Sequence, residues 1–237
     1  MEKKITIIEA GRTFADLAKK KGDFADWVAE GMAVPRGQIR VVPAFEGSAL
    51  PDLAEVSAVV VPGSHAMVTD RAPWSEFLAG WLAKAVEQDL PVLGICYGHQ
   101  LLAHALGGQV GYHPGGGEFG SVSIRLLPGA QDDPLFSGMP PVFPAQVFHR
   151  QSVLTLPPGA RLLAASSADP HHAFVCGRRA WGVQFHPEFD AAVTGNYLDI
   201  EGARLTERGF DVQALRDSVC PTSEAWSLLR RFRRLIG

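Results

Sequence analysis

The stretch Leu93-Gly94-Ile95-Cys96-Tyr97-Gly98-His99-Gln100 joins an apolar run, residues 90–95, to a segment of helical periodicity that stops at Gly107-Gly108. It predicts a buried strand that turns sharply into a helix, with Cys96 at the turn. Glycines on both sides of the cysteine suit such a turn, because they have no Cβ atoms to obstruct the backbone. Free N–H groups at the helix N-terminus would stabilise a thiolate. The pattern Gly-x-Cys-x-Gly is therefore typical of a nucleophile elbow with sulfur as the attacking atom.

A second motif, Gly182-Val183-Gln184-Phe185-His186-Pro187-Glu188-Phe189, lies 90 residues downstream. The proline after His186 favours extended backbone, and residues two apart in an extended chain share a face. Glu188 can then orient the imidazole of His186. Alone, a His-Pro-Glu triplet is a weak signal. Paired with Cys96, it predicts a nucleophile, a general acid/base and an orienting carboxylate.

Short β-rich runs alternate with segments of helical periodicity through the first half of the chain, which predicts a largely parallel α/β sheet. The expected strands are residues 5–8, 39–42, 58–61 and 90–95, and the expected helices are residues 24–28, 74–86 and 97–106. Between residues 108 and 186 the pattern changes to an appended antiparallel region. Its expected strands are residues 121–127, 142–148, 161–165, 173–176 and 181–185. An amphipathic helix over residues 225–236 closes a C-terminal helical extension.

Composition excludes several classes of protein. The chain has 237 residues, 46% of them hydrophobic, and a net charge of −3, so nothing in the overall charge attracts nucleic acid or an anionic membrane. No apolar run approaches the ~20 residues of a membrane span. The three cysteines include no C-x-x-C pair, and His171-His172 has no evident cysteine or carboxylate partner, so we expect no disulfide and no metal site. We expect a cytoplasmic protein without a signal peptide.

Together, Gly-Ile-Cys-Tyr-Gly-His-Gln and Gly-Val-Gln-Phe-His-Pro-Glu resemble the signature pair of the class I, triad-type glutamine amidotransferases. The resemblance is strongest to the amidotransferase domain of GMP synthase and its stand-alone relatives, and it covers residues 40–190. It implies a flavodoxin-like three-layer α/β fold, glutamine as amide donor and no cofactor. We expect residues 1–190 to form this domain and residues 191–237 to form a helical extension packed on it.

The resemblance also implies a role for each matching residue. Cys96 would be the nucleophile, His186 the general acid/base and Glu188 its orienter. The backbone N–H groups of Gly63 and Tyr97 would form the oxyanion hole. The amino-acid end of glutamine would be held by Gln100, His149, Arg150 and Gln151.

Two departures from the family pattern bear on the substrate. Family members often have Gly-Gly at Gly63-Ser64 and His-Gly-Asp at His149-Arg150-Gln151. Loss of the acidic residue leaves two enzymatic hypotheses open, a stand-alone glutaminase and a γ-glutamyl peptide hydrolase that uses the same triad. A non-catalytic regulatory subunit is the third alternative. No ATP-pyrophosphatase loop is present, so a separate synthetase would have to receive any ammonia that is used.

Overall fold

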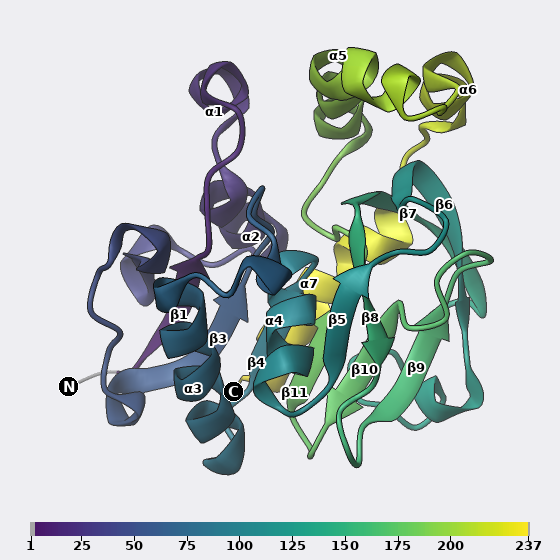
Figure 1. Cartoon of the computed structure of the whole chain (residues 1–237). Coiled ribbons are helices and arrows are strands. Elements are labelled where there is room, and N and C mark those ends of the chain that lie inside the picture. The colour runs from purple at the N-terminus through teal and green to yellow at the C-terminus, as the bar shows by residue number, and fades with distance from the viewer. Residues whose placement is uncertain (1–2, 237) are drawn as a thin grey trace.

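A nine-stranded mixed sheet runs through the protein, whose computed structural model describes residues 3–236 (Figure 1). Its strand order is β2-β1-β3-β4-β11-β10-β9-β6-β7. Neighbours are parallel in the first half of this order, which comprises β2 (Ile39–Pro43), β1 (Lys4–Glu9), β3 (Val56–Val61), β4 (Val92–Ile95) and β11 (Ala180–Val183). They are antiparallel in the second half, which comprises β10 (Ala173–Cys176), β9 (Arg161–Ala165), β6 (Glu118–Leu126) and β7 (Val142–His149). A separate antiparallel pair consists of β5 (Gln109–Tyr112) and β8 (Gln151–Thr155).

Helices cover both faces of the parallel half, and the strand side chains alternate between them. The helices are α1 (Ala15–Lys21), α2 (Phe24–Met32), α3 (Pro73–Glu87), α4 (Tyr97–Ala105), α5 (Ala191–Glu207), α6 (Val212–Ser218) and α7 (Ser223–Leu235). On β3, Val60 packs in the cluster that contains α2 and α7, whereas Val59 and Val61 pack in the cluster that contains α3 and α4. The strand is therefore buried on both faces, which explains the apolar run over its residues 58–61.

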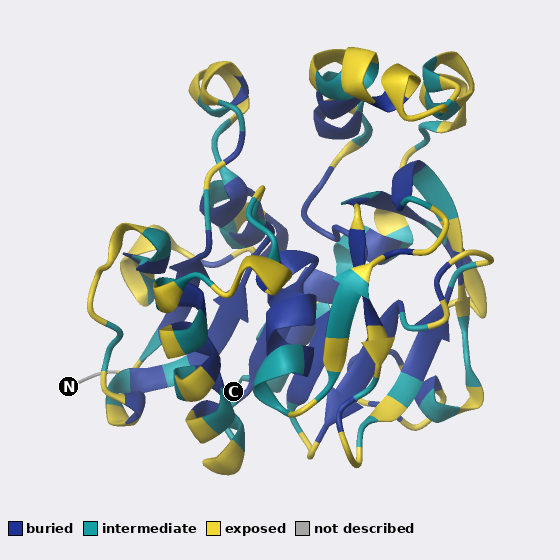
Figure 2. Cartoon of the chain, viewed as in Figure 1, coloured by how far each residue is buried: buried dark blue, intermediate teal, exposed yellow. Residues whose placement is uncertain are grey.

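The helices after residue 190 occupy two different places. In Figure 1, α5 and α6 lie together beyond one edge of the sheet, where α5 contacts β6 and β7 and α6 contacts β6. Much of the surface of this pair is exposed (Figure 2). By contrast, α7 returns to the sheet, packs on α2 and buries Leu228, Leu229 and Phe232 in the main core. We refer to α5 and α6, residues 191–218, as the cap.

The predicted α/β class is confirmed. The assignment of the strand expected at residues 181–185 to the antiparallel region was wrong in part, because β11 pairs in parallel with β4 on one side and antiparallel with β10 on the other. Some boundaries differ. The strand expected at residues 181–185 ends at Val183, because Gln184 and His186 leave the main ladder to pair with His172 and Gln146. The pair of β5 and β8 was not predicted. No helix among the described residues has both the length and the apolar character that a bilayer span requires.

Candidate active site

Cys96 lies at the sharp turn between β4 and α4, as the elbow pattern predicts. Its backbone has a φ of 51°, a conformation that L residues other than glycine rarely adopt. Both flanking glycines are required by close backbone contacts. A Cβ on Gly94 would lie 2.3 Å from the Gly98 carbonyl oxygen, and one on Gly98 would lie 2.0 Å from that of Val61. The two glycines of Gly-x-Cys-x-Gly thus allow β3, β4 and α4 to pack this closely.

The imidazole of His186 lies between the Cys96 sulfur and the Glu188 carboxylate. Its Nδ1 is 2.8 Å from Glu188 Oε1, and both side chains are buried. Burial by itself would lower the pKa of His186. The charges of Glu188 and Cys96, and hydrogen bonds to both, outweigh burial and raise the pKa to about 10. The surroundings therefore favour an imidazolium in contact with the sulfur, as an acid/base partner of a thiolate requires.

Backbone and aromatic contacts hold the His186 ring in place. Its backbone N–H donates to the Gln146 carbonyl oxygen at 2.8 Å, which ties this segment to β7. The ring stacks on Phe189, with centroids 4.0 Å apart, and lies parallel to Phe24 at 6.4 Å. These contacts fix the ring orientation that the Glu188 hydrogen bond requires.

The backbone N–H groups of Gly63 and Tyr97 lie on the two chain segments beside Cys96. Tyr97 is the first residue of α4, and Gly63 follows β3. Neither N–H has an acceptor among the described residues. A Cβ on Gly63 would come within 2.9 Å of His186 Cε1, so only glycine allows the imidazole this close. Two free donors near the sulfur are what an oxyanion hole needs.

The four side chains expected to hold the amino-acid end of glutamine all line one cavity with Cys96. Three of them also have internal partners. Gln100 donates to the Gln151 carbonyl oxygen at 2.7 Å, His149 contacts Glu118 through Nε2 and the Gln151 carbonyl oxygen through Nδ1, and Gln151 donates to the Thr69 hydroxyl. Arg150 is exposed, and its side chain has no hydrogen-bond or ion-pair partner in the described part of the chain. Its guanidinium is therefore free to meet an anionic group.

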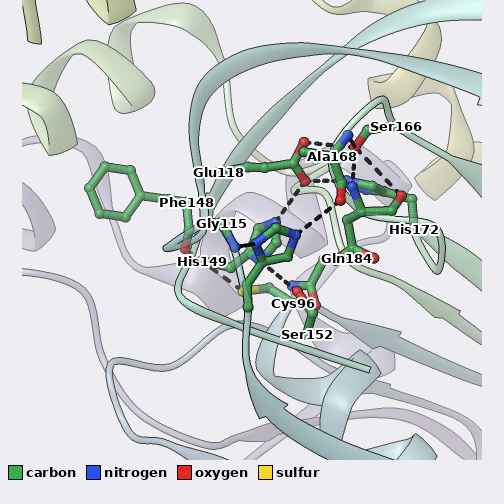
Figure 3. A network of polar contacts seen from close by, with 12 residues as sticks. Cys96, Gly115, Glu118, Phe148, His149, Ser152, Ser166, Ala168, His172 and Gln184 are labelled. Atoms are coloured by element: carbon green, nitrogen blue, oxygen red, sulfur yellow. Dashed lines mark hydrogen bonds and ion pairs between the residues drawn. The ribbon is translucent and has the colours of Figure 1, made fainter. Parts of the chain in front are cut away.

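Behind His149 lies a buried polar network that the sequence did not reveal (Figure 3). Glu118 Oε2 is 3.2 Å from His149 Nε2 and 2.7 Å from His172 Nε2, and Glu118 Oε1 accepts from Ser166 at 2.7 Å. Burial raises the pKa of Glu118, but the hydrogen bonds from both histidines outweigh it and hold the pKa well below its usual value. The network anchors β6, β7 and the loop before β10 to one another.

The expectation that His172 has no carboxylate partner was wrong, because Glu118 reaches it from β6, 54 residues away in sequence. With His149 and Asp169, these residues bring four potential ligand atoms within 4.8 Å of one another. Two ligands of one tetrahedral zinc ion lie ~3.4 Å apart at bond lengths of ~2.1 Å. The separation of 2.7 Å between Glu118 and His172 is shorter. It fits a hydrogen bond and not shared coordination of one ion.

The cavity at Cys96 has a volume of about 490 Å³ and is lined on one side by the cap. Phe14, Phe119 and Phe148 supply apolar walls. The cap residues that line it are Glu201, Arg204, Leu205, Glu207 and Arg208. None of them was predicted. The spacing of residues 201, 204, 205 and 208 places them on one helix face, but nothing in the sequence showed that this face covers the cavity.

Comparison with known proteins agrees with this architecture. The model of the family "Glutamine amidotransferase class-I" matches residues 26–199. The chain is 34% identical over 205 residues to a GMP synthase (glutamine-hydrolyzing) of Aeropyrum pernix, an alignment that spans 84% of this chain and 38% of that protein. It is 38% identical over 119 residues to one of the subunits of a GMP synthase (glutamine-hydrolyzing) of Methanoregula boonei, spanning 49% of this chain and 62% of the relative.

Solved structures share the fold over the whole chain. A glutamine amidotransferase from Thermotoga maritima superimposes with a TM-score of 0.77 at 19% identity, over 100% of this chain and 99% of that one. One from Methylobacillus flagellatus gives 0.77 at 24% identity, over 99% and 95%. With the family match spanning most of the sequence, the chain belongs to the class-I glutamine amidotransferase family.

Proposed function

We propose that this protein hydrolyses the γ-amide of glutamine through a thioester on Cys96, giving glutamate and ammonia. The observation that carries the proposal is the position of Cys96. Its sulfur lies on a strained turn at the wall of the cavity and interacts with the buried pair of His186 and Glu188. A strained, cavity-facing cysteine beside an imidazolium is the arrangement of an activated nucleophile.

The reaction follows from this arrangement. The Cys96 sulfur attacks the amide carbon, and the N–H groups of Gly63 and Tyr97 stabilise the oxyanion that forms. His186 gives a proton to the amide nitrogen, the C–N bond breaks, and ammonia leaves. Water, deprotonated by the now neutral imidazole, attacks the γ-glutamyl thioester and displaces the sulfur. Glu188 keeps the imidazole oriented through both steps.

We also propose that a separate synthetase receives the ammonia. The chain spans 38% of the length of the Aeropyrum relative, and the Methanoregula relative is named as one of the subunits of a GMP synthase. The name of the Methanoregula relative supports an amidotransferase that works beside another chain. Combining the purified protein with such a synthetase would show ammonia transfer if the two form a pair.

A second substrate class is favoured by the size and charge of the cavity. Its volume of about 490 Å³ lies within the ~300–1,000 Å³ of pockets that hold drug-sized ligands. The Arg150 side chain has no hydrogen-bond or ion-pair partner in the described residues, and aromatic rings form part of the cavity walls. These features suit γ-glutamyl peptides as well as glutamine.

The decisive experiment compares glutamate release from glutamine and from a panel of γ-glutamyl dipeptides by wild type and Cys96→Ala. We expect turnover of at least one compound by wild type, none by the variant, and a γ-glutamyl adduct on Cys96 in quenched wild-type samples by mass spectrometry. Cys176→Ala is the matched control, because burial raises the pKa of that thiol to about 11 and the residue lies away from the cavity. Equal activity in wild type and Cys96→Ala would contradict the proposal. Absence of turnover and adduct with every compound would instead support a non-catalytic role.

A further inference from the structure

The cap supplies the carboxylates that line the cavity at Cys96. A γ-glutamyl substrate carries an α-ammonium and an α-carboxylate, and a partly enclosed cavity must offer an opposite charge to each. Among the described residues that line the cavity, the carboxylates are Glu201 and Glu207, and both lie on α5. On the Cys96 side, Gln100 and Gln151 are neutral, and their amide N–H groups are already bonded internally. Only α5 therefore presents a carboxylate to the ammonium group.

Of these two carboxylates, Glu201 is the one suited to binding. Its side chain is 19% exposed, whereas Glu207 lies on the exposed end of the helix. Glu201 forms an ion pair with Arg204 at 3.0 Å, but Arg204 is 76% exposed, so water screens this pair. A carboxylate has about four acceptor positions, and the Arg204 contact uses one of them. Glu201 therefore keeps acceptor positions for a further donor.

His65 is a second cavity residue close to Glu201. Burial lowers the pKa of His65, and the nearby charge of Glu201 partly opposes that effect. The same ring is influenced by His186 and by Arg150. His65 also lines the cavity. His65 also contacts the hydroxyl of Tyr197, one turn before Glu201 on α5, at 3.4 Å, so Glu201 and His65 are neighbours in the cavity lining.

We propose that Glu201 binds the α-ammonium group of the glutamyl substrate and makes the enzyme selective for a free α-amino group. This inference rests on the proposed hydrolysis at Cys96. Residue 201 follows position 199, where the match to the family model ends, so the contact belongs to the cap of this chain. Glu201 is a specificity-determining residue and takes no part in bond breaking.

The test compares Glu201→Gln with wild type on two substrates, glutamine and 4-carboxybutanamide, which is glutamine without its α-amino group. We expect Glu201→Gln to raise the KM for glutamine by roughly 10- to 100-fold with kcat unchanged, the size of a lost hydrogen bond to a charged group. On 4-carboxybutanamide, the variant and wild type should have equal kcat/KM. Asp199→Asn is the matched control, because Asp199 lies on the same helix, is exposed and does not line the cavity, and it should match wild type on both substrates.

A second readout needs no turnover. Wild type should be alkylated at Cys96 by the γ-diazoketone analogue of glutamine faster than by the same analogue without its amino group, and Glu201→Gln should lose this preference. Glu201→Asp should retain part of it, which shows that the folded cap tolerates the position. An unchanged KM for glutamine in Glu201→Gln, or an equal loss on both substrates, would overturn the inference. If wild type neither turns over glutamine nor reacts with the diazoketone, the proposed function itself fails and the inference falls with it.

Discussion

The two sides of the cavity are built in different ways. On the Cys96 side, each position has a local steric reason: Gly94 and Gly98 allow three elements to meet, and Gly63 allows the His186 ring to approach. On the cap side, four of the five lining residues are long and charged, and they belong to a largely exposed part of the molecule (Figure 2). Substitutions on the first side should therefore abolish chemistry or folding, whereas those on the second should alter binding.

The largest effect is expected from Glu188→Gln. The amide preserves the shape of the side chain but no longer supplies the charge that orients His186 and raises its pKa. By analogy with other triads, kcat should fall by ~10²–10⁴ while KM changes little. Steady-state kinetics on glutamine checks this, with Glu207→Gln as a carboxylate control outside the triad. A loss confined to KM would place Glu188 in substrate binding instead.

Two helical glycines test the steric argument. Gly98→Ala should lower the free energy of unfolding by several kcal/mol, because the new methyl group would lie 2.0 Å from the Val61 carbonyl oxygen. Gly80→Ala, on α3 with nothing within 4 Å of the added carbon, should raise it by ~0.5–1 kcal/mol. Urea denaturation of both variants measures the difference. Similar stabilities would mean that β3 and α4 move apart freely.

The pH dependence of stability reports on His186. Its pKa is about 10 in the folded protein against 6.5 for an ordinary histidine, so the folded state binds the proton more tightly. This stabilisation is fully present below pH 6.5 and is lost as the pH rises toward 10. The free energy of unfolding of wild type should therefore decline across that window. Glu188→Gln should show a shallower decline, and identical slopes in the two proteins would contradict the assigned cause.

Sequence alone predicted the Cys96 side well, because its determinants are short-range. The glycines around Cys96 and the extended His186-Pro187-Glu188 segment each encode their own geometry within a few residues. The strands β3 and β4 were equally clear, since burial on both faces makes residues 58–61 and 92–95 apolar. The prediction that Cys96 and His186 lie close together rested on the pairing of the two motifs. The structure places the strands that precede them, β4 and β11, side by side in the sheet.

Long-range pairing explains what was missed. Glu118 and His172 are 54 residues apart, and no local sequence pattern at either residue predicts their contact. The register of β6 brings Glu118 opposite His149, which no periodicity specifies. The position of α5 over the cavity follows from its packing on β6 and β7, which no pattern in its own sequence indicates.

The smallest effect is expected at the outer end of the cap. Arg208 donates to the Gly116 carbonyl oxygen and lies 5.5 Å from the ring centroids of both Phe119 and Phe210. Exposed cation–π contacts of this kind contribute ~0.5–1 kcal/mol. Arg208→Gln should therefore leave kcat unchanged and increase amide hydrogen exchange by a few fold in residues 191–218, with none in β1 or β3. Lys in place of Arg208 keeps the charge and should restore part of the protection. If amide hydrogen exchange instead accelerated equally across the sheet, the cap and the parallel half would open as one unit. The two sides of the cavity would then have the same local stability.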